Sequence, residues 1–167
     1  MASCQDQRET EMKFDDCGDV RLAEQEDIPQ IIELLKEHFR ENGNHTLSEN
    51  KIITLISLHY NKSGGVIGVI GDRGGKLKGL IILAVTQLWY SDNYILDEVS
   101  LFVRPENRKS DYAKQLMVFA KKASDTLDLE LRISVWSNER TEAKIKLYQR
   151  QFKLKGASFN YNEKPKL

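Results

Sequence analysis

The chain has 167 residues, and its 25 lysines and arginines balance 25 aspartates and glutamates. Zero net charge gives no global electrostatic reason to expect a nucleic-acid or membrane partner, so any charge-driven binding has to be local. The longest apolar runs, such as residues 80–85, are too short to span a bilayer, and the N-terminus lacks the apolar core of a signal peptide. We therefore expect a cytoplasmic protein that binds neither nucleic acid nor membrane.

Residues 1–18 are polar, acid-rich and aperiodic, which is typical of a poorly ordered leader. They contain both cysteines, Cys4 and Cys17, and we expect free thiols in a reducing compartment. The three dispersed histidines lack metal-ligand spacing with these cysteines, so no metal site is predicted. The length favours one domain, which we place at residues 19–161, with a tail over residues 162–167.

The first half of that domain is predicted to form a strand, two helices and a hairpin. Residues 19–23 form the strand. Asp27 is expected to cap the first helix in a capping box with Gln30, and Gly43 to end it. Ser48 is expected to cap the second helix. Strands over residues 66–70 and 78–85 then flank a glycine-rich turn, which is a strong hairpin pattern.

The second half alternates strands and helices. Strands are predicted at residues 94–103 and 131–135, and a helix lies between them at residues 110–127. A further helix is predicted to begin a few residues after Asn138, and residues 157–161 are predicted to form a closing strand. The whole order is β-α-α-β-β-β-α-β-α-β, which indicates a mixed α/β domain with helices on both faces of one sheet.

A cationic loop joins the strand over residues 94–103 to the helix that follows. It holds Arg104, Pro105, Arg108 and Lys109 and is followed by Ser110. The first N–H groups of a helix have no partner within the helix and attract anions. Two formal charges and a hydroxyl beside them make this loop a candidate phosphate site.

Two motifs resemble the GCN5-related N-acetyltransferase (GNAT) superfamily. That family has a strand ending in Leu-aromatic-Val, then an Arg/Gln-x-x-Gly-x-Gly/Ala loop. Arg108 and Ala113 match the outer positions, whereas Asp111 stands where glycine is usual. Residues 147–152 look like the family's Leu-Tyr-x-x-Gly-Phe ending, with Gln151 in place of glycine. The Arg-Lys-Ser loop and a long spacing from Asn138 to the tyrosine resemble phage-encoded members.

The resemblance implies a fold and an activity. The fold is α/β, with a mixed, mostly antiparallel central sheet, helices on both faces, and the fourth and fifth strands splayed. The activity is direct transfer of acetyl from acetyl-CoA to a primary amine in a ternary complex, without a metal. Residues expected to contact the cofactor come from the strand end, the loop, the helix start and the turn after the fifth strand: Leu101, Phe102, Val103, Arg108, Lys109, Ser110, Asp111, Tyr112, Ala113 and Asn138.

Asp111 is the residue that argues most against a phosphate site, because a carboxylate that faced the phosphates would repel them. We expect its side chain to point to solvent. Its backbone is expected to be right-handed, which the first turn of a helix permits without glycine.

Tyr148 is expected to give a proton to the leaving thiolate, as in relatives. A backbone N–H near Phe102 or Val103 would stabilise the oxyanion. The base is expected to be Glu98, with Asp97, or neither carboxylate, as alternatives. Strict alternation along the strand puts Glu98 and Ser100 on one face and so favours Glu98.

The acceptor is expected to be an amine-bearing small molecule or protein, and the chain a monomer or homodimer. The alternative function is a catalytically degenerate GNAT-fold module that binds CoA or a protein. The departures at Asp111 and Gln151 are its main support. Nucleic-acid binding through helix lysines is weaker, because solvated helix faces explain those lysines.

Overall fold

A computed structural model describes residues 17–43, 45–60, 64–135, 137 and 140–156. The element order agrees with the predicted one up to the last helix, and the closing strand expected at residues 157–161 lies outside the described residues. The elements are β1 (Val20–Leu22), the 3-10 turn η1 (Gln25–Asp27), α1 (Ile28–Asn42), α2 (Glu49–Tyr60), β2 (Gly65–Ile70), β3 (Gly79–Gln87), β4 (Tyr94–Val103), the 3-10 turn η2 (Pro105–Asn107), α3 (Tyr112–Leu127), β5 (Glu130–Arg132) and α4 (Thr141–Gln149).

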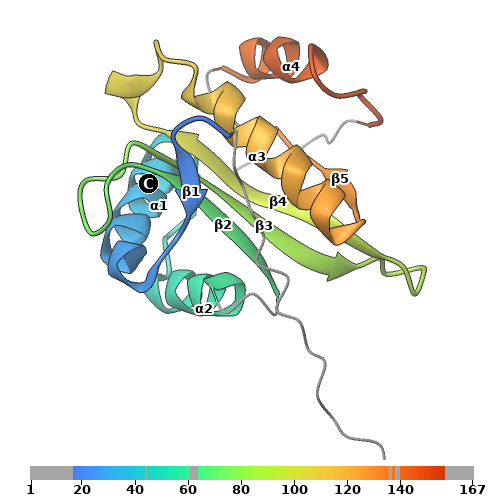
Figure 1. Ribbon diagram of the computed structural model, residues 1–167, viewed down its shortest axis with the longest axis horizontal. Coiled ribbons are helices and arrows are strands. Elements are labelled where there is room, and N and C mark those ends of the chain that lie inside the picture. Colours follow the sequence, from blue (N-terminus) through green and yellow to red (C-terminus); the bar gives the residue numbers. More distant parts are fainter. Residues whose placement is uncertain (1–16, 44, 61–63, 136, 138–139, 157–167) are drawn as a thin grey trace, which may run out of the picture.

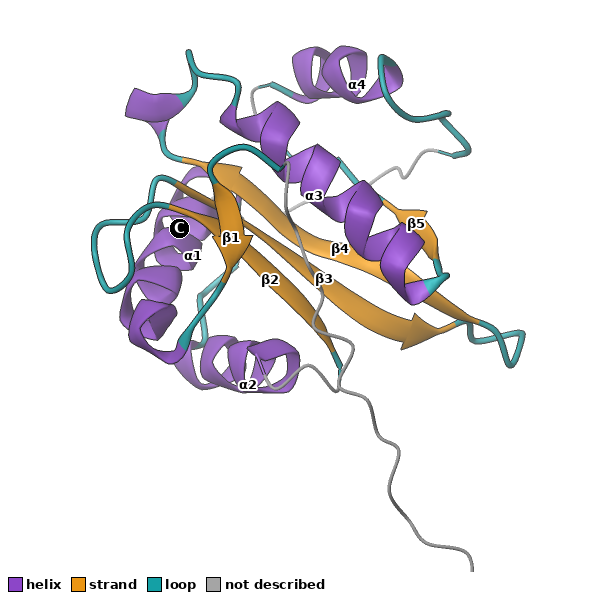
Figure 2. Ribbon diagram, viewed as in Figure 1, coloured by secondary structure: helices purple, strands orange, loops and turns teal. Residues whose placement is uncertain are grey.

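One five-stranded sheet orders the fold as β1-β2-β3-β4-β5 (Figure 2). Neighbouring strands are antiparallel except β4 and β5, which are parallel. The predicted mixed, mostly antiparallel sheet is therefore confirmed. The hairpin between β2 and β3 closes where the Lys78 N–H donates to the Ile70 carbonyl at 2.8 Å.

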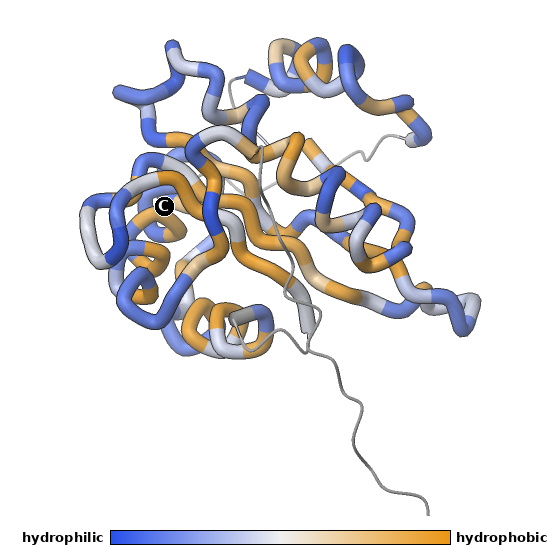
Figure 3. Tube along the Cα trace, in the orientation of Figure 1, coloured by the Kyte–Doolittle hydropathy of each residue, from blue (hydrophilic) through white to orange (hydrophobic). Residues whose placement is uncertain are grey.

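Helices cover both faces of the sheet, with α3 on one face and α1 and α2 on the other (Figure 1). Strands β2 and β3, at the centre of the sheet, are made largely of hydrophobic residues (Figure 3), as expected for strands buried on both faces. Each face has its own core cluster. Val66, Ile81, Leu83, Leu96 and Phe119 belong to the α3 side, and Ile67, Val69, Leu80, Ile82 and Phe102 to the other.

Helix α3 is held by an apolar stripe, of which Leu116, Met117, Phe119, Ala120 and Ala123 are buried. The Phe119 ring packs directly on Gly68 of β2. A Cβ on Gly68 would lie 2.8 Å from that ring, so the missing side chain is what lets the helix approach the sheet. Cys17, which the sequence placed in the leader, is buried in the same cluster at 2% exposure.

The predicted capping box at the start of α1 is wrong, because the Asp27 side chain makes no cap hydrogen bond to α1. Asp27 is fully buried, and its carboxylate accepts hydrogen bonds from Nη1 and Nη2 of Arg21 at 2.6 and 2.8 Å. It also accepts the Glu24 N–H, so the box belongs to the turn η1. Burial acts to raise the pKa of Asp27, but these hydrogen bonds hold it below its usual value. Strand β1 supplies a stronger partner than the helix N-terminus.

No helix in the described part of the chain has the length and apolar character needed to cross a membrane.

Candidate active site

A β-bulge in β4 shapes the centre of the sheet. Leu83 of β3 pairs with Glu98 while the preceding Ile82 pairs with Ser100, so Val99 is an extra residue. Directly opposed residues of antiparallel strands point to the same face. Leu83 lies under α3 and Ile82 under α1 and α2, so Glu98 and Ser100 lie on opposite faces. The prediction that they share a face is wrong, because strict alternation fails at a bulge.

Strands β4 and β5 separate just before this bulge. Their pairing ends at Asp97 and Arg132, and β5 is shorter than predicted for that reason. This is the expected splay. A cavity of about 230 Å³ lies beside it. Its lining residues come from α1, β4, the segment after β5, and α4: His38, Asp97, Glu98, Val99, Leu101, Ser134, Val135, Lys144 and Tyr148.

Both carboxylates considered as the base line this cavity. Glu98 accepts the Ser134 N–H at 3.3 Å, and burial raises its pKa to about 7, with a smaller contribution from Asp97. Burial also raises the pKa of Asp97, against the attraction of Arg132. The Oδ1 atom of Asp97 is buried without a hydrogen-bond partner among the residues that the structure describes. Glu98 therefore has the pKa best matched to proton transfer near neutral pH.

Tyr148 of α4 lines the same cavity. Its ring meets that of Phe152 edge-to-face, with centroids 6.5 Å apart. Burial raises the pKa of Tyr148, and the charge of Glu98 adds to this. The phenol is therefore protonated at neutral pH and carries a proton that it can donate.

His38 is a cavity residue that sequence reasoning missed. Its Nδ1 lies 2.8 Å from Ser100 Oγ, and its ring stacks on Phe102 with centroids 5.1 Å apart. Burial and the nearby charge of Lys144 lower the pKa of His38 to about 4, so the imidazole is neutral at pH 7. Its place on the buried side of α1 was readable from the helical period, but its cavity partners were not.

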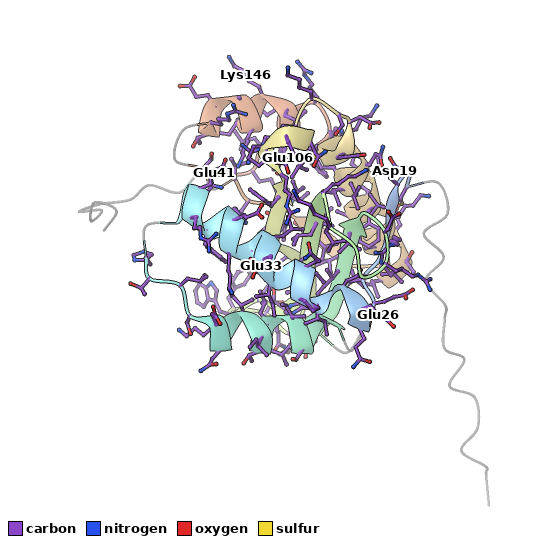
Figure 4. All side chains as sticks on the ribbon, turned by 90° about the vertical axis from the view of Figure 1, so that its left-hand side faces the viewer. Asp19, Glu26, Glu33, Glu41, Glu106 and Lys146 are labelled. Carbon is purple, nitrogen blue, oxygen red and sulfur yellow. The ribbon has the colours of Figure 1, made fainter. Side chains whose placement is uncertain are left out.

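Arg108, the first cation of the loop motif, is engaged within the protein. Its Nη2 contacts Glu41 Oε2 at 2.6 Å and its Nε donates to the Val103 carbonyl at 3.0 Å. Its guanidinium also lies 5.4 Å from the Phe102 ring centroid. Glu41 stands at the C-terminal end of α1, on the side of the molecule where α4 lies (Figure 4). The neighbouring Arg104 repeats the pattern with Glu37 of α1 at 3.0 Å.

Residues 109–111, just before α3, are exposed to solvent. Helix α3 begins at Tyr112, two residues later than expected, and Ser110 Oγ accepts the Tyr112 N–H at 3.3 Å. Asp111 is exposed with φ −90° and ψ 12°, so glycine is not needed there. Its carboxylate accepts a hydrogen bond from Gln115 Nε2 at 2.8 Å, which holds the negative charge on the side of the helix. Lys109 is exposed beside them.

The remaining predicted residues lie along β4 and α3. Phe102 and Val103 are buried on opposite faces and Leu101 lines the cavity. Tyr112 and Ala113 pack partly against the core under α3. The Tyr112 hydroxyl also accepts a hydrogen bond from Lys78 Nζ at 3.4 Å. Asn138 lies outside the described residues.

No protein-family model and no curated protein matches this sequence. Solved structures do match: AAC(6')-Iy in complex with the bisubstrate analog CoA-S-monomethyl-acetylneamine has a TM-score of 0.67 at 14% identity, covering 87% of this chain and 97% of that one. A ribosomal-protein-alanine N-acetyltransferase from Brucella melitensis has a TM-score of 0.64 at 14% identity, covering 86% and 96%. A GNAT family acetyltransferase from Staphylococcus aureus has a TM-score of 0.57 at 16% identity, covering 86% and 96%.

The chain therefore has the fold of the GNAT acetyltransferases. At identities this low the likeness establishes the fold, and an activity rests on the site's own residues.

Proposed function

We propose that this protein is an N-acetyltransferase that moves acetyl from acetyl-CoA to a primary amine by direct transfer. The observation that carries the proposal is the cavity where β4 and β5 separate, which is lined both by a carboxylate of raised pKa, Glu98, and by a protonated phenol, Tyr148. A base and an acid that line one cavity are what amine acylation from a thioester needs.

Glu98 would remove the proton that the acceptor amine must lose. An ammonium has no lone pair, and a free lysine-type amine has a pKa of about 10.4. A carboxylate with a pKa of about 7 is about half ionised in neutral solution and is more basic than an ordinary glutamate, so it can take up that proton. Asp97 remains the alternative, with the weaker support of one unpartnered oxygen.

Tyr148 would protonate the leaving thiolate. Because burial raises its pKa, the phenol stays protonated until negative charge develops beside it. The oxyanion donor would be a backbone N–H of β4 near Phe102 or Val103, on the part of the strand that β5 does not cover.

Coenzyme A would bind with its phosphates at the start of α3. Lys109 and Ser110 stand beside the first N–H groups of that helix, and the Asp111 carboxylate is bonded to Gln115. This arrangement removes the objection that Asp111 raises to an intact cofactor loop. Arg108 would reach the phosphates only by leaving Glu41.

The acceptor would be a cationic amine, since Asp97 and Glu98 both line the cavity. A small molecule or a protein side chain could supply it. Solved structures with this fold include an aminoglycoside acetyltransferase in complex with sisomicin, at 15% identity and a TM-score of 0.61.

The test has two parts. Calorimetry with acetyl-CoA measures cofactor binding, and a thiol reagent follows CoA release across a panel of amines. We expect binding and amine-dependent release. A protein that does not bind acetyl-CoA would overturn the proposal, and one that binds it but releases no CoA with any amine would favour the degenerate module.

A further inference from the structure

Lys144 places an amine of the protein itself inside the candidate active site. It lies one helical turn before Tyr148 on α4, and residues four apart share a helix face. Both side chains line the cavity that Glu98 also lines, and Lys144 is the one lysine among the lining residues that the structure describes. The primary amine that acetyl transfer requires is therefore already beside the proposed acid and base.

The surroundings of Lys144 favour its neutral form. Burial lowers the pKa of the Lys144 ammonium. The attraction of Glu41 and Glu98 opposes this, while the positive charges of Arg108 and Arg140 act in the same direction as burial. A larger fraction of this amine is consequently unprotonated at neutral pH than of an ordinary surface lysine.

Helix α4 leaves Lys144 room to reposition. All nine residues of α4, which the structure describes in full, keep part of their surface exposed to solvent, and Lys144 and Tyr148 are half-buried. Beyond its end, Lys121 of α3 donates to Gln151 Oε1 at 3.1 Å and lies over the Phe152 ring at 4.8 Å. A four-carbon side chain on such a helix can turn within the cavity without breaking core packing.

We propose that the acetyl-CoA-loaded protein acetylates its own Lys144 when no other amine occupies the cavity. This inference rests on the proposed function. The neutral Nζ of Lys144 forms a bond to the thioester carbonyl carbon and the C–S bond breaks. Glu98 takes a proton from the nitrogen and Tyr148 gives one to the sulfur, and the two side chains return to their starting states by exchange with water. The products are an amide on Lys144 and free CoA thiol.

The amide has consequences for the site. It removes the positive charge that Glu41 and Glu98 attract and adds an acetyl group to a cavity of about 230 Å³. Self-acetylation would therefore lower transfer to external amines, and an external amine would in turn protect Lys144 by occupying the same space.

The experiment incubates the full chain with acetyl-CoA alone and follows each lysine by peptide mass spectrometry. Lys146 is the internal control, because it is exposed and points outward from the same helix (Figure 4). We expect Lys144 to be acetylated at least about tenfold faster than Lys146, since holding reacting groups together replaces a bimolecular encounter. Glu98→Gln and Tyr148→Phe should remove that difference, and the rate constant should not depend on protein concentration.

Two variants complete the test. Lys144→Arg should reduce total acetyl incorporation to the level of the surface lysines, whereas Lys146→Arg should leave the fast phase intact. Equal rates at Lys144 and Lys146, or a rate that rises with protein concentration, would overturn the inference. If external amines are acetylated and Lys144 is not, only this inference fails; if acetyl-CoA does not bind, the proposed function fails first.

Discussion

The carboxylate of Glu98 accepts a hydrogen bond from the backbone N–H of Ser134 at 3.3 Å, across the place where β4 and β5 part. This contact joins the strand that carries the proposed base to the segment after β5, which also lines the cavity. The hydrogen bond stabilises the ionised form, yet burial outweighs it and the pKa of Glu98 rises to about 7.

The activity should therefore depend on pH through Glu98. We expect kcat/KM to fall as pH drops through about 7, because the base must be ionised. Glu98→Gln should lower kcat by about 100-fold or more and abolish this acidic limb. A variant that keeps the limb would assign the base to Asp97 or to another group.

Ionisation of Glu98 should lower the stability of the fold, although it raises the activity. The folded-state pKa of about 7 lies above the ordinary glutamate value of 4.5, so the stabilisation by the protonated form is lost as pH rises from 4.5 through 7. Glutamine does not ionise and can still accept the Ser134 N–H. At pH 8 the Tm of Glu98→Gln should exceed that of the wild type, and near pH 4 the two should converge. A lower Tm at pH 8 would mean that the ionised carboxylate has partners that stabilise it.

Tyr148→Phe tests the proton donor. Removing one hydroxyl keeps the ring contact with Phe152, so the fold should persist while kcat falls by about 100-fold. Tyr90→Phe, on the exposed turn after β3, is the matched control and should leave kcat unchanged. If acetyl-CoA binds and Tyr148→Phe keeps full kcat, the tyrosine is a packing residue.

The ion pair of Arg108 with Glu41 should compete with the cofactor. Glu41→Gln frees the guanidinium for phosphate, and we expect the Kd for CoA to fall by up to about fivefold, since a partly exposed pair contributes about 0.2–1 kcal/mol. Calorimetry measures this. Glu33→Gln on the same helix, which pairs with Lys36, should not change the affinity. Weaker binding in Glu41→Gln would mean that the pair positions the loop for CoA.

Gly68→Ala should destabilise the fold by about 1–3 kcal/mol, because its methyl group would lie 2.8 Å from the Phe119 ring under α3. Chemical denaturation gives the free energy of unfolding. Gly156→Ala is the control, since nothing lies within 4 Å of its added Cβ. Equal stabilities would show that α3 can shift away from the sheet without loss.

The sequence by itself determined the elements and much of their order. Apolar periodicity located α3, the glycine-rich turn located the β2–β3 hairpin, and the predicted limits of β4 match the observed strand. The sequence also pointed to Tyr148 and Glu98 as candidates. Tyr148 stands in a short motif and Glu98 on a predicted strand, and both patterns can be recognised from neighbouring residues alone.

Only the tertiary structure decided how those residues meet. The bulge at Val99 depends on pairing with β3, so alternation along β4 alone predicted the wrong face for Ser100. Arg108 is bound by Glu41, 67 residues away, and His38 and Lys144 come to one cavity from opposite ends of the chain. Short-range patterns fix helices and strands, whereas these relationships arise from contacts between distant segments that no local pattern encodes.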